Sequence, residues 1–328
     1  VSFDEIRVFT QSGTGNNCDV PTSTGNTPPV VEAGLNYTIP RNTPFALTAV
    51  GSDPNGDPVT YCWEQRDLGV AQMLSDPDNG TSPILRSWNP TTSPTRTVPR
   101  LSNLLNNTLP IGEKYPAVNR TMDFRVMVRD NRAGGGGSGS DNMVVTVNSS
   151  AGPFQVTYPN TVVTVSGPIT VTWNVASTNV APVNATNVDI FLSIDGGNTF
   201  PIVLTSNTPN DGSEQVTLPG VDTTTARIKV QGAGNIFFDI SNVNFTIYPG
   251  VGPYGACCLR NNECVLYVTL GACETLGGIY MGDGSTACIH TPEGECIPTL
   301  SEWGIVVLAL LTATGGTVIL RRRVPAHA

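Results

Sequence analysis

The chain has 328 residues, a formal net charge of −9 and a sequence pI near 4.7. This length predicts two or three domains, and the acidic balance excludes a nucleic-acid partner because no basic stripe exists to displace counterions. Only 13% of the residues are charged, whereas 34 glycines and 26 prolines interrupt the chain, a composition typical of extracellular β-sandwiches.

Residues 1–26 are predicted to be the remnant of an upstream, catalytic-type domain. Phe3, Ile6 and Phe9 fall on one helical face, and the helix should stop before Gly13. A lone amphipathic helix cannot form its own core. Because the chain starts at Val1 with no initiator methionine or export signal, we expect it to be the C-terminal part of a longer protein.

Residues 27–149 are predicted to form a first β-sandwich. Period-two patterns at Phe45–Val50, Val59–Gln65, Phe124–Val128 and Met143–Val147 indicate strands, and Pro, Gly, Asn and Asp break them. The stretch from residue 67 to residue 121 is rich in Pro, Ser and Asn and is too long for an ordinary hairpin loop. We therefore expect irregular structure there, at one end of the sandwich.

The D-P-N-G-D turn of this sandwich is the best candidate for a bound ion. Oxygen donors that alternate by two in a tight turn suit calcium, which takes six to eight hard ligands. The alternative is a Pro/Gly turn whose aspartates face water, and the sequence favours this alternative. The candidate calcium ligands are Asp53, Asn55 and Asp57, completed by Asp130 and Asp141 from a later loop.

Residues 150–249 are predicted to form a second β-sandwich. About seven short strands are separated by turn signals, a spacing typical of immunoglobulin-like and cadherin-like folds. Trp173 is available for the core. Neither predicted sandwich has two cysteines at sandwich spacing, so each core must hold without an internal disulfide.

Residues 250–297 form a small cysteine-rich module. A segment of about this size rarely folds by burial alone, and disulfides are the expected source of its stability. Zinc is the alternative, but paired C-x-x-C motifs are absent and His290 is the only nearby imidazole. The sequence does not choose a pairing among the six cysteines, which are Cys257, Cys258, Cys264, Cys273, Cys288 and Cys296.

Residues 298–328 are predicted to be a tail with a transmembrane helix. Gly304–Leu320 carries no charge, and as a helix it would be roughly 26 Å long, close to the thickness of a bilayer core. Trp303 stands where an interfacial anchor belongs, and a cytoplasmic flank follows, namely Arg321, Arg322 and Arg323. The alternative, a buried core helix, would not need three arginines at its end.

The residues just before this helix carry a family resemblance. Ile297 is followed by Pro298, Thr299, Leu300, Ser301, Glu302, Trp303 and Gly304. With the apolar helix and the arginines, this pattern resembles the IPTL-CTERM sorting signal of Gram-negative envelope proteins. The resemblance implies export, recognition and cleavage by a membrane-embedded sorting protease, and location at the cell envelope or surface, with the C-terminus cytoplasmic before processing.

No catalytic machinery can be assembled from this chain. It contains two histidines, His290 and His327, no H-E-x-x-H motif, and no serine or cysteine nucleophile with a plausible histidine base. We therefore expect that the chain by itself is not an enzyme, and calcium is the one candidate cofactor, with the ion-free turn favoured over it.

A second resemblance spans most of residues 2–248. It is carried by N-T-P-P-V-V (Asn26–Val31), Y-T-I-P-R-N-T-P-F-A-L-T (Tyr37–Thr48), G-S-D-P-N-G-D, Y-C-W-E-Q (Tyr61–Gln65), S-W-N-P-T-T-S-P-T-R (Ser87–Arg96), R-D-N-R-A-G-G-G (Arg129–Gly136) and N-I-F-F-D-I-S-N-V-N-F-T-I (Asn235–Ile247). Together these segments resemble the region after the catalytic domain of secreted bacterial reprolysin-like zinc metallopeptidases. None of that family's zinc-binding residues is present, so no catalytic role transfers to this chain.

The sequence therefore predicts a mostly β chain: two tandem Ig-like or cadherin-like β-sandwiches, a small disulfide-rich module and a C-terminal transmembrane helix. The expected function is that of a non-catalytic targeting and spacer region, whose partners are an upstream metallopeptidase domain in the same parent chain and the sorting protease. The alternative is a cell-surface stalk or adhesin that binds a glycan or a protein directly.

Overall fold

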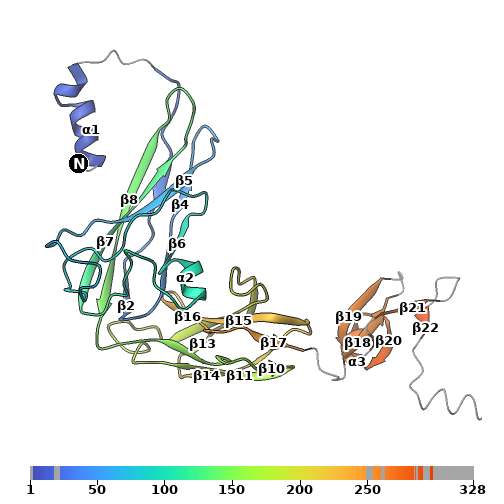
Figure 1. The fold of residues 1–328 in the computed structure, drawn as a ribbon. Coiled ribbons are helices and arrows are strands. Elements are labelled where there is room, and N and C mark those ends of the chain that lie inside the picture. The colour runs from blue at the N-terminus through green and yellow to red at the C-terminus, as the bar shows by residue number, and fades with distance from the viewer. Residues whose placement is uncertain are drawn as a thin grey trace, which may run out of the picture. The chain divides into compact units, whose positions relative to one another are not determined.

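The computed structural model describes residues 3–17, 23–248, 254–259, 263–283, 285, 287–290 and 296–297 (Figure 1). The chain divides into two compact units. The first unit comprises Val1–Leu104, Leu109–Gly152 and Asn235–Phe237, and the second comprises Leu105–Thr108, Pro153–Gly234 and Phe238–Ala328. Both are built mainly from β-strands, as the sequence predicts.

The chain begins with a short amphipathic helix, α1 (Phe3–Gln11), followed by a 3-10 turn, η1 (Thr14–Asn17). The helix ends before Gly13, as the sequence predicts. Its apolar side chains remain largely in solvent, since Ile6 is 49%, Val8 63% and Phe9 56% exposed. The described residues therefore do not cover this apolar face.

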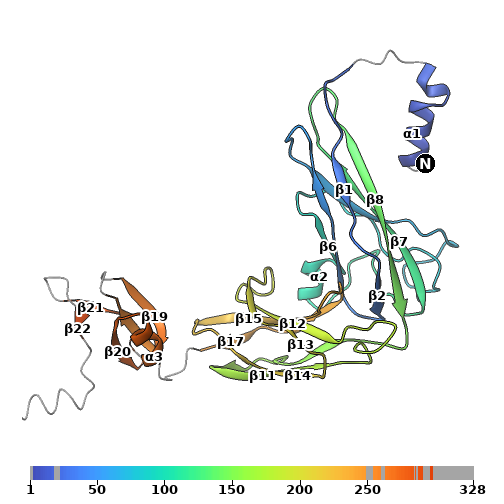
Figure 2. The ribbon, with the colours of Figure 1, turned by 180° about the vertical axis from the view of Figure 1, so that it is seen from behind.

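The first unit is a β-sandwich. Its main sheet has the order β2 (Tyr37–Pro40), β8 (Ser138–Asn148), β7 (Arg120–Arg129) and β5 (Thr60–Gln65). Two further strand pairs complete the unit, β1 (Val30–Glu32) with β4 (Val50–Ser52) and β3 (Phe45–Thr48) with β6 (Thr95–Val98). Figure 2 shows the long β7 and β8 of this unit from behind.

Alternating residues of these strands meet in the core of the first unit. Phe45 of β3 and Phe124 of β7 are fully buried, and their rings pack edge to face with centroids 6.1 Å apart. Trp63 of β5 is also buried and donates its indole N–H to the Pro94 carbonyl at 3.0 Å. The period-two pattern in the sequence corresponds to one buried face on β3, β5 and β8, whereas every residue of β7 from Phe124 to Val128 is buried.

The long stretch from residue 67 to residue 121 is more ordered than the sequence predicts. It contributes β6 (Thr95–Val98) and the helix α2 (Leu101–Leu105). The expectation of irregular structure is therefore wrong for these two elements.

The second unit contains another sandwich. One sheet has the order β14 (Ser213–Thr217), β11 (Pro168–Asn174), β9 (Gln155–Tyr158). The other has the order β10 (Thr164–Val165), β17 (Phe245–Ile247), β15 (Thr223–Gly232), β12 (Asn187–Ser193), β13 (Ile202–Pro209), with β16 (Phe238–Ile240) also paired to β15. The sequence predicts strands that match seven of these but none at β9 or β16; the predicted ranges are Val162–Val165, Ile169–Val175, Val188–Ile194, Ile202–Thr205, Glu214–Leu218, Ala226–Gln231 and Asn244–Ile247.

A buried polar side chain ties the second sandwich together in place of a disulfide. Trp173 is 4% exposed, and its indole N–H donates to Oδ1 of Asn210 at 2.8 Å. The Asn210 amide donates in turn to Oγ1 of Thr178 at 2.9 Å and to the Ala185 carbonyl at 2.8 Å. Asn210 is 2% exposed and is fully hydrogen-bonded, which is the condition under which a buried amide is tolerated.

In each sandwich an early strand runs parallel to the last strand of that sandwich. In the first, β2 pairs with β8, from Tyr37 opposite Val145 to Pro40 opposite Asn148. In the second, β10 pairs with β17 in the same sense. All other pairings in the two sandwiches are antiparallel.

The described part of the cysteine module is a small three-stranded antiparallel sheet. Its strands are β18 (Tyr254–Cys258), β19 (Cys264–Thr269) and β20 (Ile279–Asp283), in the order β19-β18-β20. The short helix α3 (Leu270–Thr275) links β19 to β20, and β21 (Ile289–His290) pairs with β22 (Cys296–Ile297).

Candidate functional site

The predicted calcium ligands begin in the turn after β4. Oδ1 of Asp53 accepts the backbone N–H groups of Asn55 at 2.8 Å and of Asp57 at 3.2 Å, which closes the turn on itself. Gly56 has a φ of 81°, a conformation that glycine adopts without steric cost. The sequence D-P-N-G-D thus specifies a compact loop with or without an ion.

The other oxygens of this turn are less satisfied. Oδ2 of Asp53 and Oδ2 of Asp57 are buried and accept no hydrogen bond in the described part of the chain. The nearest described cation is Arg132, whose Nη1 lies 3.6 Å from Oδ2 of Asp57. This guanidinium offsets part of the negative charge of the turn.

The remaining predicted ligands are already engaged. Asp130 accepts the N–H of Gly137 at 2.8 Å and the side-chain amide of Asn26 at 2.6 Å, and this amide, more than any other group, lowers the pKa of Asp130. Asp141 lies within β8 and not in the predicted loop, because its backbone pairs with Val126 of β7, and its Oδ2 accepts the N–H of Ala33 at 2.7 Å. Across the described residues no group of three or more His, Cys, Asp or Glu side chains could hold a metal ion. Calcium binding therefore stays a prediction.

The structure shows a second polar cluster, in the first unit, that sequence reasoning missed. Its centre is Glu113, whose side chain is fully buried. Oε1 of Glu113 accepts the indole N–H of Trp88 at 2.7 Å and Nη2 of Arg96 at 2.9 Å, and Oε2 accepts the backbone N–H of Arg100 at 2.9 Å. One carboxylate thus fixes three points of the 67–121 stretch.

A similar junction secures the earlier half of that stretch. Arg120, on β7, pairs with Oδ1 of Asp78 through Nη1 at 2.7 Å and donates Nη2 to the Ser82 carbonyl at 2.9 Å. The side chains of Arg120 and Asp78 are both essentially buried. If the long stretch moved away from the sheet, the pair would separate and leave an unpaired buried charge, which is strongly unfavourable. These junctions therefore hold the long stretch against the sheet.

A cavity of about 650 Å³ opens beside the Glu113 cluster. It lies between β5, β6 and the segment that carries Trp88, and its lining includes two arginines that stack on Trp88, with Arg86 Cζ 4.7 Å and Arg100 Cζ 5.0 Å from the ring centroid. The free thiol of Cys62 also lines it and donates to the Trp88 carbonyl at 3.4 Å. Burial, above all, raises the pKa of Cys62.

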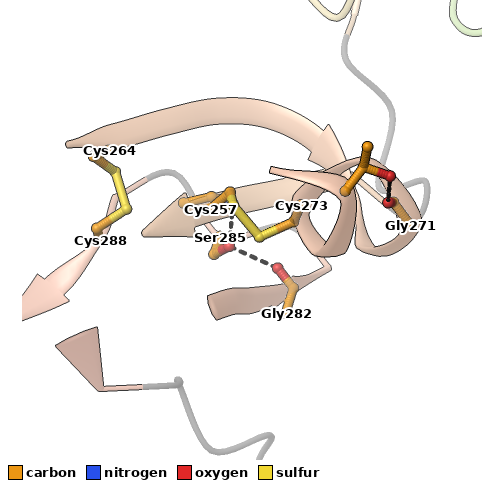
Figure 3. The surroundings of a disulfide bond; sticks show 9 residues. Cys257, Cys264, Gly271, Cys273, Gly282, Ser285 and Cys288 are labelled. Carbon is orange, nitrogen blue, oxygen red and sulfur yellow. Dashed lines mark hydrogen bonds between the residues drawn. A yellow bond between two sulfur atoms is a disulfide. The ribbon is translucent and has the colours of Figure 1, made fainter. Parts of the chain in front are cut away.

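The predicted disulfides of the cysteine module are present in its described part. Cys257 pairs with Cys273 and Cys264 pairs with Cys288 (Figure 3). Cys258 is disulfide-bonded as well, so the adjacent Cys257 and Cys258 do not pair with each other. Figure 3 also shows the Ser285 hydroxyl, which donates to the Gly282 carbonyl at 2.6 Å and so closes the turn after β20.

The predicted tail lies outside the described residues. This applies to the motif Pro298–Gly304, the helix Gly304–Leu320 and the arginines Arg321–Arg323. Within the described residues, no helix has the length and apolar character needed to cross a membrane. The predicted transmembrane helix is therefore not shown.

Comparison with known proteins identifies one motif. The IPTL-CTERM motif matches residues 297–323, which confirms that the chain is an exported, envelope-sorted protein with a C-terminal sorting signal. No curated protein matches the chain.

Several solved structures match this chain, all at low similarity. The chicken CNTN1 FN1–FN3 domains are 13% identical over 68% of this chain and 69% of theirs, with a TM-score of 0.24. The titin domains Z1Z2, in complex with telethonin, are 10% identical over 68% and 96%, with a TM-score of 0.21. A Dscam structure is 11% identical over 68% and 46%, with a TM-score of 0.20. The fold assignment therefore stands on the strand pairing of this chain itself.

Proposed function

We propose that this chain is the non-catalytic C-terminal region of an exported zinc metallopeptidase, and that it spaces and positions the catalytic domain at the cell envelope. The observation that carries the proposal is the sorting motif at residues 297–323, which follows two β-sandwiches and a cysteine module. A sorting motif directs the chain that carries it to the envelope, so the proposed role is delivery. The metallopeptidase parentage comes from the sequence segments that resemble the region after a reprolysin-like catalytic domain.

The tail would act as a removable signal. A helix over Gly304–Leu320 would hold the chain in the inner membrane of a Gram-negative bacterium, with Arg321–Arg323 on the cytoplasmic side. Pro298 keeps the residue before it extended, which is the conformation that proteases bind. A membrane-embedded sorting protease would then cut near the motif, and another attachment would replace the helix and keep the chain at the envelope.

The cysteine module suits a position next to this cleavage site. Its described strands are cross-linked by two disulfides, which contribute about 2–4 kcal/mol each by restricting the unfolded chain. A module stabilised in this way stays folded in an oxidising compartment even though its core is small. It would separate the sandwiches from the membrane while the tail is processed.

Two experiments test the proposal. The chain is exported in its native host with the tail intact or with residues 298–328 deleted, and envelope and medium fractions are compared. We expect the intact chain in the envelope and the deleted chain in the medium, and equal distribution would contradict the delivery role. Separately, the parent gene should encode an H-E-x-x-H-x-x-G-x-x-H motif upstream; further sandwich repeats in its place would contradict the metallopeptidase parentage.

A further inference from the structure

The cavity of the first unit carries positive charge that the described chain does not neutralise. Arg86 and Arg100 are exposed, and their guanidinium groups stack on Trp88. Among the described residues, no carboxylate lies within ion-pair distance of either guanidinium group. Glu113, which lies beside the cavity, pairs with Arg96 instead. Two uncompensated cations at one cavity are unusual in a chain whose formal net charge is −9.

The two guanidinium groups are held by a rigid support. The Trp88 ring is fixed by its hydrogen bond to Glu113 at 2.7 Å. Arg96 reinforces this support, since its Nη1 donates to the Trp63 carbonyl of β5 at 2.7 Å. A guanidinium stacked on a fixed ring loses less conformational entropy when it binds an oxyanion than a free side chain does. The site is therefore preorganised for acidic groups.

The rest of the cavity wall is rich in short polar side chains. Ser87, Asn89 and Thr97 line it, and their side chains make no hydrogen bond within the described residues. Together they offer two hydroxyls and one amide, which both donate and accept hydrogen bonds. A volume of about 650 Å³ is in the range of small-molecule sites. Hydroxyls and an amide beside cations match a ligand that carries both hydroxyl and acidic groups.

We propose that this cavity binds an acidic saccharide, with Arg86 and Arg100 pairing with its carboxylate or sulfate oxygens and the short polar side chains bonding its hydroxyls. Arginine binds either oxyanion through paired hydrogen bonds. An acidic peptide would use the arginines but would leave the hydroxyl-rich wall unused. This inference goes beyond the positioning role and does not depend on it, because the cavity lies within the first unit.

Isothermal titration calorimetry on the full chain tests the proposal. The probes are trigalacturonate, which carries a carboxylate on each ring, sucrose octasulfate, neutral maltotriose and triglutamate. We expect binding of the first, the second or both, with the stronger of the two identifying the preferred oxyanion. Arg86→Gln and Arg100→Gln should each weaken binding about tenfold, which is the loss of one charged hydrogen bond. Arg41→Gln, at another exposed arginine of the same unit, should leave binding unchanged.

A second readout places the ligand. Cys62 lines the cavity, so a bound saccharide should slow its alkylation by a thiol reagent, measured by peptide mass spectrometry. Absence of binding by both acidic saccharides would overturn the proposal. It would also be overturned if triglutamate bound as tightly as they do, or if Arg41→Gln weakened binding as much as Arg100→Gln. None of these outcomes bears on envelope delivery, which is measured separately.

Discussion

Replacing Glu113 should destabilise the first unit strongly, because this carboxylate is the only described counter-charge of Arg96. The two side chains are 0% and 9% exposed, respectively. Removing one partner of a buried ion pair costs about 3–5 kcal/mol, most of it from the charge left unpaired. Glu113→Ala should therefore lower the unfolding free energy by about that amount and the midpoint temperature by roughly 10 °C. Glu113→Gln keeps the volume and one acceptor oxygen, and should cost about 1.5–3 kcal/mol.

Calorimetry on the full chain and hydrogen exchange measure this effect. Exchange of the amides around Trp88 and Arg100 should accelerate, while amides of the second unit should keep their protection. Glu32→Ala, at an exposed carboxylate on β1, is the matched control and should change little. Adding Arg96→Met to Glu113→Ala should recover part of the loss, since no unpaired charge remains. A Glu113→Ala protein as stable as the Glu32→Ala control would refute the role given to this cluster.

Three further predictions concern other parts of the chain. Burial raises the pKa of Asp239 to about 7, so the folded state holds a proton that the unfolded state releases near pH 4. The unfolding free energy should therefore fall as pH rises from about 4 to about 7. Asp239→Asn can still accept the Val156 N–H but does not titrate, so it should flatten this slope in urea melts measured at several pH values. An unchanged slope would reject the assignment to Asp239. If the D-P-N-G-D turn binds calcium, a calcium concentration a hundredfold above Kd should raise the unfolding free energy by about 2.7 kcal/mol, and Asp57→Ala should remove this effect. Identical thermal melts with calcium and with chelator would show that the aspartates only form the turn. Mass spectrometry of protein from the native host should find a C-terminus before Gly304, and normal processing of Pro298→Ala or Trp303→Ala would reject the motif as a cleavage signal.

The sequence predicts strands where several apolar residues follow one another closely. Phe124–Val128 and Met143–Val147 lie toward the C-terminal ends of β7 and β8, and the strands begin earlier, at Arg120 and Ser138. The strands β9 and β16 were missed because they have four and three residues and carry too few alternations to stand out. Backbone pairing with neighbouring strands, which a single sequence does not display, extends β7 and β8 and forms β9 and β16.

The sequence of residues 67–121 contains no local signal for the ordered structure that this stretch adopts. It depends on contacts between residues far apart in the chain, such as Arg96 with Glu113 at a separation of 17 and Arg120 with Asp78 at 42. Before folding, each of these side chains is an ordinary charged residue in a Pro-rich segment. Only the burial of both partners distinguishes them. Arg86 and Arg100, which are exposed, are distinguished only by their proximity to the Trp88 ring in the folded chain.

The five predicted calcium ligands show a different limit of sequence-based prediction, because here the residue types are visible in the sequence but their hydrogen bonds are not. The D-P-N-G-D spacing predicts a tight turn, and the structure places Asp53, Asn55 and Asp57 in one, while calcium binding stays a prediction. What the sequence could not supply is the competing set of donors. Backbone N–H groups and the Asn26 amide occupy the oxygens of Asp130 and Asp141. A ligand pattern in a sequence shows which residues carry oxygen atoms, but it does not show which hydrogen bonds those oxygens already accept.

The parallel strand pairs have a mechanical consequence for a protein attached at an envelope. The chain enters β2 at Tyr37, beside Val145, and leaves β8 after Asn148, which lies beside Pro40. Tension on the two ends therefore pulls β2 and β8 along their length in opposite directions, so their hydrogen bonds are loaded together in shear. Antiparallel strands pulled from the same end would instead unzip one bond at a time. Since forced unfolding is governed by the unfolding rate rather than by the equilibrium, this geometry resists a sudden pull better than its modest number of bonds suggests. The pair β10 and β17 repeats it in the second sandwich.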